Sequence, residues 1–128
     1  MLRKLKNLYH LGESMVGKMM FNRTLDGMTF IGVTGTDGKT TTSNLIYHIL
    51  TQAGQKAALI STISAVIDGN QLDTGFHVTT PIPLALQAYI KDAKKSGAKY
   101  VVLEVTSHAL DQYRVFGIPF TIGVMTNI

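Results

Sequence analysis

The sequence predicts an α/β fold with a mainly parallel sheet that is flanked by helices. Four apolar runs typical of buried strands lie at residues 29–34, 57–62, 100–105 and 120–125, and helical patterns lie between them. Strands that alternate with helices form right-handed βαβ units, which place the strands in parallel. With 128 residues, of which 45% are hydrophobic and 16% charged, the chain has room for one globular domain of this kind.

Residues 1–28 are expected to form a helix and a linker, and residues 29–128 the domain that follows. Apolar residues recur at mostly helical spacing over residues 2–20. This pattern indicates an amphipathic helix that packs on the domain, with a basic helix that lies on a membrane surface as the alternative. Residues 22–27 predict a loop that leads into the first strand.

Turn residues and glycines mark the elements within residues 29–128. Gly54 is expected to end the first helix of the domain. The Asp-Gly-Asn-Gln sequence at 68–71 lies between short apolar runs at 64–67 and 72–76, and predicts a hairpin at the edge or rim of the sheet. The other helical patterns run from about Leu84 to Lys95 and near 109–114.

Composition and charge exclude several classes of protein. The net charge of +4 is modest and forms no stripe, so a nucleic-acid partner is not expected. The absence of cysteine excludes disulfides and thiolate metal sites. Apolar runs of about 18 residues, the length that spans a bilayer, are absent, and the N-terminus does not resemble a signal peptide. We therefore expect a cytoplasmic protein without a transmembrane segment.

A glycine-rich motif follows the first strand. Residues 34–42 are Thr-Gly-Thr-Asp-Gly-Lys-Thr-Thr-Thr, and a helical pattern begins there. In a P-loop, backbone N–H groups and a helix N-terminus surround phosphate, a lysine contacts the β- and γ-phosphates, and a hydroxyl binds Mg²⁺. The motif therefore predicts ATP and Mg²⁺ as cofactors, with Lys39 on phosphate and Thr40 on the metal. The residues expected to bind the nucleotide are Gly35, Thr36, Asp37, Gly38, Lys39, Thr40 and Thr41.

The strict P-loop pattern is not met, because Val33 occupies the position where it requires glycine. The alternative is an ordinary helix N-terminus that is entered through a glycine turn. Strand and helix nevertheless lie where a P-loop needs them, which favours phosphate binding.

Glu104 lies near the end of the apolar run at 100–105. The carboxyl ends of strands in an open α/β sheet face the ligand crevice, where the P-loop also opens. Glu104 is therefore expected to bind Mg²⁺ directly or through water, as a Walker-B acid does. The alternative is a glutamate in water or in a salt bridge.

These motifs resemble those of the Mur ligases, the ATP-dependent amino-acid ligases of peptidoglycan precursor synthesis. Thr-Gly-Thr-Asp-Gly-Lys-Thr-Thr is similar to the variant P-loop of that family. Glu-Val-Thr-Ser-His-Ala-Leu at 104–110, followed by Gln112 and Arg114, resembles the UDP-N-acetylmuramoyl-tripeptide synthetase branch, as does Thr-Thr-Pro at 79–81. The resemblance runs from about residue 30 to residue 128.

The resemblance implies a set of residues that contact the muramoyl peptide substrate. They are Thr79, Thr80, Thr106, Gln112 and Arg114. His108 is implied as a catalytic residue that orients the metal shell or the substrate, and a histidine held by local hydrogen bonds is the alternative. Two departures from the family pattern are Ala109, where a positive φ would strain the backbone, and Ile82, where the family has an acid.

The implied reaction is ligation of an amino acid to a UDP-N-acetylmuramoyl peptide through an acyl phosphate. A P-loop module that binds or hydrolyses ATP without ligation is the alternative, and a P-loop kinase would explain neither of the other two motifs. The resemblance also implies that residues 29–128 are the N-terminal part of the family's central ATP-binding domain. The chain alone is therefore expected to be inactive, to need further C-terminal sequence, and to leave its last strand uncovered unless it inserts between earlier strands.

Overall fold

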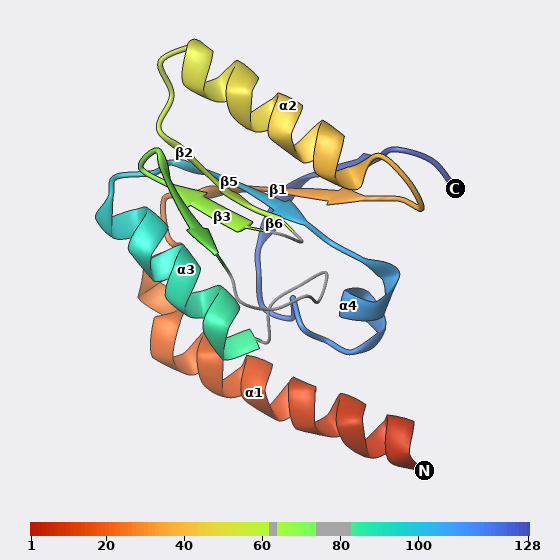
Figure 1. The fold of residues 1–128 in the computed structure, drawn as a ribbon. Coiled ribbons are helices and arrows are strands. Elements are labelled where there is room, and N and C mark those ends of the chain that lie inside the picture. Colours follow the sequence, from red (N-terminus) through yellow and green to blue (C-terminus); the bar gives the residue numbers. More distant parts are fainter. Residues whose placement is uncertain (62–63, 74–82) are drawn as a thin grey trace.

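The computed structural model describes residues 1–61, 64–73 and 83–128. Its strands form one six-stranded sheet in the order β4-β3-β2-β5-β1-β6 (Figure 1). Strands β2, β5, β1 and β6 are parallel to one another. Strands β3 and β4 form an antiparallel hairpin, and β3 pairs with β2 in the antiparallel direction. The strands are β1 (Thr29–Thr34), β2 (Ala57–Ile60), β3 (Ser64–Ile67), β4 (Asn70–Asp73), β5 (Tyr100–Glu104) and β6 (Phe120–Met125). The predicted α/β fold with a mainly parallel sheet is confirmed.

Helices cover both faces of the sheet. Figure 1 shows α2 on one face, and α1 and α3 side by side on the other. The helices are α1 (Leu2–Leu25), α2 (Lys39–Gln52), α3 (Pro83–Lys95) and α4 (Ser107–Asp111). No helix among the described residues is long and apolar enough to cross a membrane.

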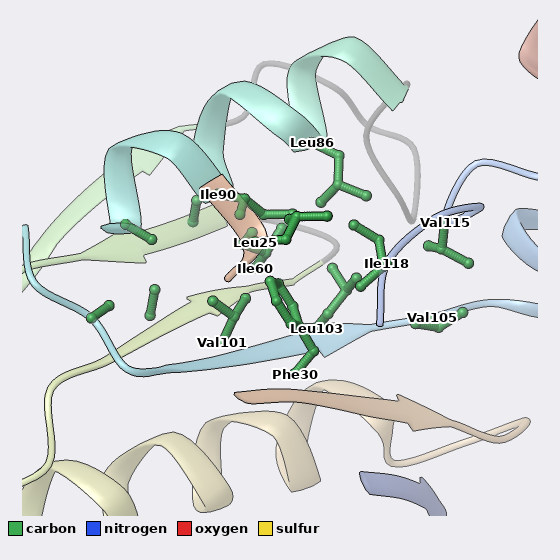
Figure 2. Close-up of a cluster of buried hydrophobic side chains, with 14 of the residues drawn as sticks. Leu25, Phe30, Ile60, Leu86, Ile90, Val101, Leu103, Val105, Val115 and Ile118 are labelled. Atoms are coloured by element: carbon green, nitrogen blue, oxygen red, sulfur yellow. The ribbon is translucent and has the colours of Figure 1, made fainter. Parts of the chain in front are cut away.

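The core has two parts because the sheet has two covered faces. The larger part lies between the sheet and the face of α3, where Leu86 and Ile90 pack with strand residues such as Phe30 (Figure 2). The smaller part lies under α2 and contains Ile31, Val33, Leu59 and Val102. Alternate residues of β1 thus supply both parts, as the period of two along a strand requires.

The edge strand β6 pairs with β1 and, within the described part of the chain, with no other strand. Phe120, Ile122 and Met125 are exposed. The strand is therefore uncovered at the sheet edge, as expected for a final strand that does not insert between others.

Three boundaries differ from the sequence prediction. The loop predicted at 22–27 is wrong, because α1 continues to Leu25, which is buried in the core, and Gly27 then turns with φ 76°. The hairpin turn is shorter than predicted, since Asp68 and Gly69 both have positive φ and β4 already begins at Asn70. Positive φ at both central residues is the geometry of a two-residue hairpin. The end of the run at 72–76 lies outside the described residues.

The short helix α4 also begins earlier than predicted, at Ser107 instead of near residue 109. Thr106 caps it, because its Oγ1 accepts a hydrogen bond of 3.1 Å from Ala109 N. Ala109 lies inside this helix, is buried, and is not among the residues with positive φ. The positive φ that would strain the backbone at this position is therefore absent.

Candidate nucleotide-binding site

The loop between β1 and α2 has the backbone that a phosphate-binding turn needs. Gly35 and Gly38 have φ values of 141° and 78°, which side chains disfavour. A Cβ atom at Gly35 would also collide with Thr126 Oγ1. Among the described residues, no side chain caps the N-terminus of α2, and its first turn contains no acid. Its leading N–H groups and the positive end of its dipole are therefore directed at the loop.

Lys39 is the first residue of α2, and its ammonium group lies over the loop. Lys39 Nζ donates to the carbonyl oxygens of Gly35 at 2.7 Å and Thr36 at 3.0 Å. An ammonium group has three N–H donors, so these two contacts leave one donor for a phosphate oxygen. The loop thus holds the lysine in place before any ligand arrives.

Thr40 and Glu104, the predicted metal ligands, are in contact. Thr40 Oγ1 donates to Glu104 Oε1 at 3.1 Å and to Oε2 at 3.0 Å. Glu104 is only 2% exposed, and it reaches this position because β5 pairs with β1 in a register that aligns Val33 with Glu104. The ends of the two strands therefore bring a hydroxyl and a carboxylate together at the start of α2.

A hydroxyl and a carboxylate are the oxygen ligands that Mg²⁺ prefers. The described residues contain no cluster of three or more His, Cys, Asp or Glu side chains that could hold a metal by themselves. Mg²⁺ is commonly bound by one or two protein oxygens together with substrate phosphates and water. The two side chains fit that mode of binding, with Lys39 one residue away.

A cavity of about 440 Å³ opens beside the loop. It is lined by residues from the loop, from the start of α4 and from the end of β6, including Lys39, Thr106, His108 and Asn127. His108 is exposed on this cavity, which places the predicted catalytic histidine next to the predicted phosphate site. Thr106 also lines the cavity, although its hydroxyl accepts the capping hydrogen bond of α4.

The other predicted substrate contacts lie apart from this cavity or outside the description. Gln112 and Arg114 follow α4, and Arg114 Nε donates to Gln112 Oε1 at 2.8 Å. Neither residue lines the cavity. Thr79 and Thr80 lie outside the described residues.

Sequence reasoning missed two residues that brace the loop. Asn127 Oδ1 accepts hydrogen bonds from the backbone N–H groups of Thr36 at 2.8 Å and Asp37 at 3.1 Å. Asn127 Nδ2 and Thr126 Oγ1 both donate to the carbonyl oxygen of Asp37, at 3.0 Å and 2.6 Å. The signal was available, because these polar residues follow a strand whose carboxyl end faces the same crevice. Two loop N–H groups are thus engaged within the protein.

A strand, a glycine-rich turn and a helix that bring together a lysine, a hydroxyl and a buried carboxylate define a P-loop α/β domain. The family model described as Mur ligase middle domain matches residues 33–128. The chain therefore belongs to the Mur ligase family, as its motifs predicted.

Several proteins similar to this chain share one name. The chain is 43% identical over 118 residues to the UDP-N-acetylmuramoyl-L-alanyl-D-glutamate--2,6-diaminopimelate ligase of Geobacter sulfurreducens, covering 92% of this chain and 23% of that protein. It is 45% identical over 101 residues to the Pseudomonas putida ligase of the same name, covering 79% and 20%. A solved structure of a ligase of this name matches with a TM-score of 0.71 and 36% identity, covering 80% of this chain and 20% of that chain. The chain thus spans 20% to 23% of the length of these relatives.

Proposed function

We propose that this chain supplies the nucleotide-binding part of an ATP-dependent ligase that joins an amino acid to a UDP-N-acetylmuramoyl peptide in peptidoglycan precursor synthesis. The observation that carries the proposal is the meeting of Lys39, Thr40 and Glu104 at the start of α2. Family membership supplies the class of reaction. The names of the relatives make UDP-N-acetylmuramoyl-L-alanyl-D-glutamate the first acceptor to test and 2,6-diaminopimelate the first amino acid.

The proposed reaction has two transfers. An oxygen of the acceptor carboxylate attacks the γ-phosphorus of ATP, the bond to the β-phosphate oxygen breaks, and ADP leaves an acyl phosphate behind. The amine nitrogen of the amino acid then attacks the acyl carbon, inorganic phosphate departs, and the nitrogen loses a proton as the amide forms. Phosphoryl transfer is catalysed mostly by positioning the reactants and stabilising charge. The residues of this site are suited to both.

The residues in and around the loop have separate roles in the first transfer. The remaining N–H of the Lys39 ammonium group binds a β- or γ-phosphate oxygen while the other two keep their loop carbonyls. Thr40 and Glu104 would hold Mg²⁺, whose positive charge would offset that of the phosphate oxygens. Asn127 keeps the loop in shape by binding two of its N–H groups.

The residues beyond the loop are assigned to the acceptor. His108 orients the metal shell or the acceptor carboxylate from the wall of the cavity. Arg114, oriented by Gln112, offers a planar fork that suits a peptide carboxylate. Thr106, Thr79 and Thr80 complete the proposed contacts with the muramoyl peptide.

Nucleotide binding tests the first half of the proposal. Lys39→Ala should weaken Mg·ATP binding by about 2 kcal/mol, roughly 30-fold, because a charge-assisted phosphate contact is lost. Calorimetry measures this, with Lys99→Ala as the matched control, since Lys99 precedes β5 at the opposite end of the strands. Equal affinities of Lys39→Ala and the parent would refute the phosphate role.

The metal assignment has its own test. Glu104→Gln keeps the size of the side chain but removes its charge, so ATP binding should lose most of its dependence on Mg²⁺ concentration. Titration of ATP at several Mg²⁺ concentrations measures this. A Mg²⁺ dependence that matches the parent would remove Glu104 from the metal site.

Ligation itself is tested in two proteins. The 128-residue chain should form no amide from Mg·ATP, acceptor and amino acids, because an acyl phosphate at an open site reacts with water. Amide above the enzyme-free control would contradict this. A chimera of the Geobacter sulfurreducens ligase that carries residues 29–128 of this chain should form the amide, and its Lys39→Ala variant should not. Hydrolysis of ATP by the chimera without amide would favour a module that does not ligate.

A further inference from the structure

Most of the apolar side chains described on α1, Leu25 aside, face away from the domain. The large exposed hydrophobic side chains of α1 are Leu2, Leu5, Leu8, Tyr9, Met15, Val16 and Met19, with exposed fractions between 51% and 87%. At 100° per residue these positions fall within an arc of about 140° around the helix. We call this surface the apolar stripe. It runs along most of the helix on the side that the domain does not cover.

The opposite side of α1 is polar and holds the helix to the domain. His10 and Ser14 are buried there, and Ser14 Oγ donates to the carbonyl oxygen of Tyr113 at 2.6 Å. Asn7 Nδ2 donates to the carbonyl oxygen of Asp111 at 2.9 Å. The apolar stripe is therefore not the surface by which α1 packs on its own fold, which is the reverse of an ordinary amphipathic helix.

The net positive charge of the chain also lies in α1. Residues 2–25 contain five basic residues and one acidic residue, whereas residues 26–128 contain seven of each sign. Lys4 and Lys6 are exposed and lie at the two borders of the apolar stripe. Arg3 and Lys18 lie nearer the domain, where Arg3 contacts Asp111 and Lys18 lies over the ring of Phe116.

We propose that the apolar stripe docks on an anionic lipid bilayer, with α1 parallel to the membrane plane. A broad apolar arc bordered by lysines is the pattern of interfacial helices, whose lysines reach lipid phosphates while the apolar side chains enter the acyl boundary. The charge of α1 complements an anionic surface. Pairing of two α1 stripes would instead oppose two cationic helices, and the one acid of the helix, Glu13, already contacts His10 at 3.1 Å.

The orientation that follows leaves the nucleotide site in water. Helix α1, which carries the stripe, lies on one face of the sheet, whereas α2, at whose start the nucleotide site lies, covers the other face (Figure 1). The proposal rests on the basic charge of α1 and on the exposure of its apolar stripe, and it goes beyond the proposed ligase function.

A single labelled cysteine tests docking, because the chain has no native cysteine. Leu8→Cys carries an environment-sensitive dye on the stripe, and Leu45→Cys carries it on an exposed leucine of α2. With vesicles of equal parts phosphatidylcholine and phosphatidylglycerol, the dye at residue 8 should brighten and shift to the blue, and the dye at residue 45 should not. Pure phosphatidylcholine should bind much less, and added salt should weaken binding to the anionic vesicles.

Paired substitutions provide the control. The double variant Leu5→Glu/Tyr9→Glu should lower vesicle binding at least tenfold, because two charges enter the stripe. Leu45→Glu/Ile49→Glu makes a matched change at the same spacing on α2, where both residues are exposed, and should bind as the parent does. Thermal melting checks that both variants fold.

Three results would overturn the proposal. They are absence of binding to anionic vesicles, equal binding to both kinds of vesicle, and equal loss of binding in the two double variants. A dimer in sedimentation that Leu5→Glu/Tyr9→Glu dissolves, without vesicle binding by the parent, would assign the stripe to a second copy of the chain.

Discussion

Helices α1 and α3 lie side by side on the same face of the sheet and bury opposite kinds of surface (Figure 1). Leu86, Ile90 and Ala93 of α3 point into the larger core, and lysines lie at its exposed end. Helix α1 adds one described residue, Leu25, to that core, whereas nearer its N-terminus His10 and Ser14 are its buried polar residues. Helical periodicity predicts both helices, but it does not say which way an apolar face turns. Four changes test this comparison.

The largest effect is expected in the core of α3. Ile90→Ala should destabilise the fold by about 2–5 kcal/mol, because a fully buried side chain is replaced by a cavity. Urea unfolding measures the change. Ile49→Ala on α2 is the control, since that isoleucine is 60% exposed, and equal costs for both variants would contradict the burial of α3.

The second-largest effect is expected where α1 and α3 make close contact. A Cβ atom at Gly17 of α1 would lie 3.1 Å from Gln87 Cγ of α3. Gly17→Leu should therefore cost about 1–3 kcal/mol through overpacking. Gly12→Leu is the control, because nothing lies within 4 Å of a Cβ there. If both variants melt alike, α1 does not pack on α3 at Gly17.

A smaller effect is expected on the apolar stripe. Leu5→Ala should change the free energy of unfolding by less than about 0.5 kcal/mol, because Leu5 is exposed and contributes little to packing. Leu86→Ala in α3 is the buried counterpart. A Leu5→Ala cost in the range of Leu86→Ala would show that the stripe is covered in the folded chain.

The smallest effect concerns the ion pair that joins α1 to α4. The hydrogen bond from Arg3 lowers the pKa of the Asp111 carboxyl. A carboxyl with a lowered folded-state pKa stabilises the fold above its unfolded-state pKa, and this contribution is lost as the pH falls through the folded-state value. Arg3→Ala should therefore raise the pKa of Asp111 in an NMR titration. An unchanged pKa would mean that the exposed pair does not form in solution.

Much of the site could be predicted because its geometry is local or follows from strand order. The glycine turn, Lys39 and Thr40 are consecutive, so the sequence places them together. The position of Glu104 beside them was predicted because the carboxyl ends of parallel strands meet at one edge of the sheet. Asn127 obeys the same rule, but its contact with Thr36 and Asp37, some ninety residues earlier, depends on β6 pairing beside β1, which the sequence did not predict. The Gln112–Arg114 contact and the capping role of Thr106 were missed for a different reason, because they depend on where α4 begins and ends, which the sequence placed only approximately.

The sequence by itself determined the α/β class, the phosphate-binding motif and the family of this chain, because periodicity, glycine spacing and strand ends act over short distances. Only the tertiary structure decided that β6 stays at the edge, that α1 continues to Leu25, and that its apolar stripe faces outward. These outcomes depend on which surfaces the sheet and the other helices leave uncovered. Burial is a property of the whole fold, so no single segment encodes it.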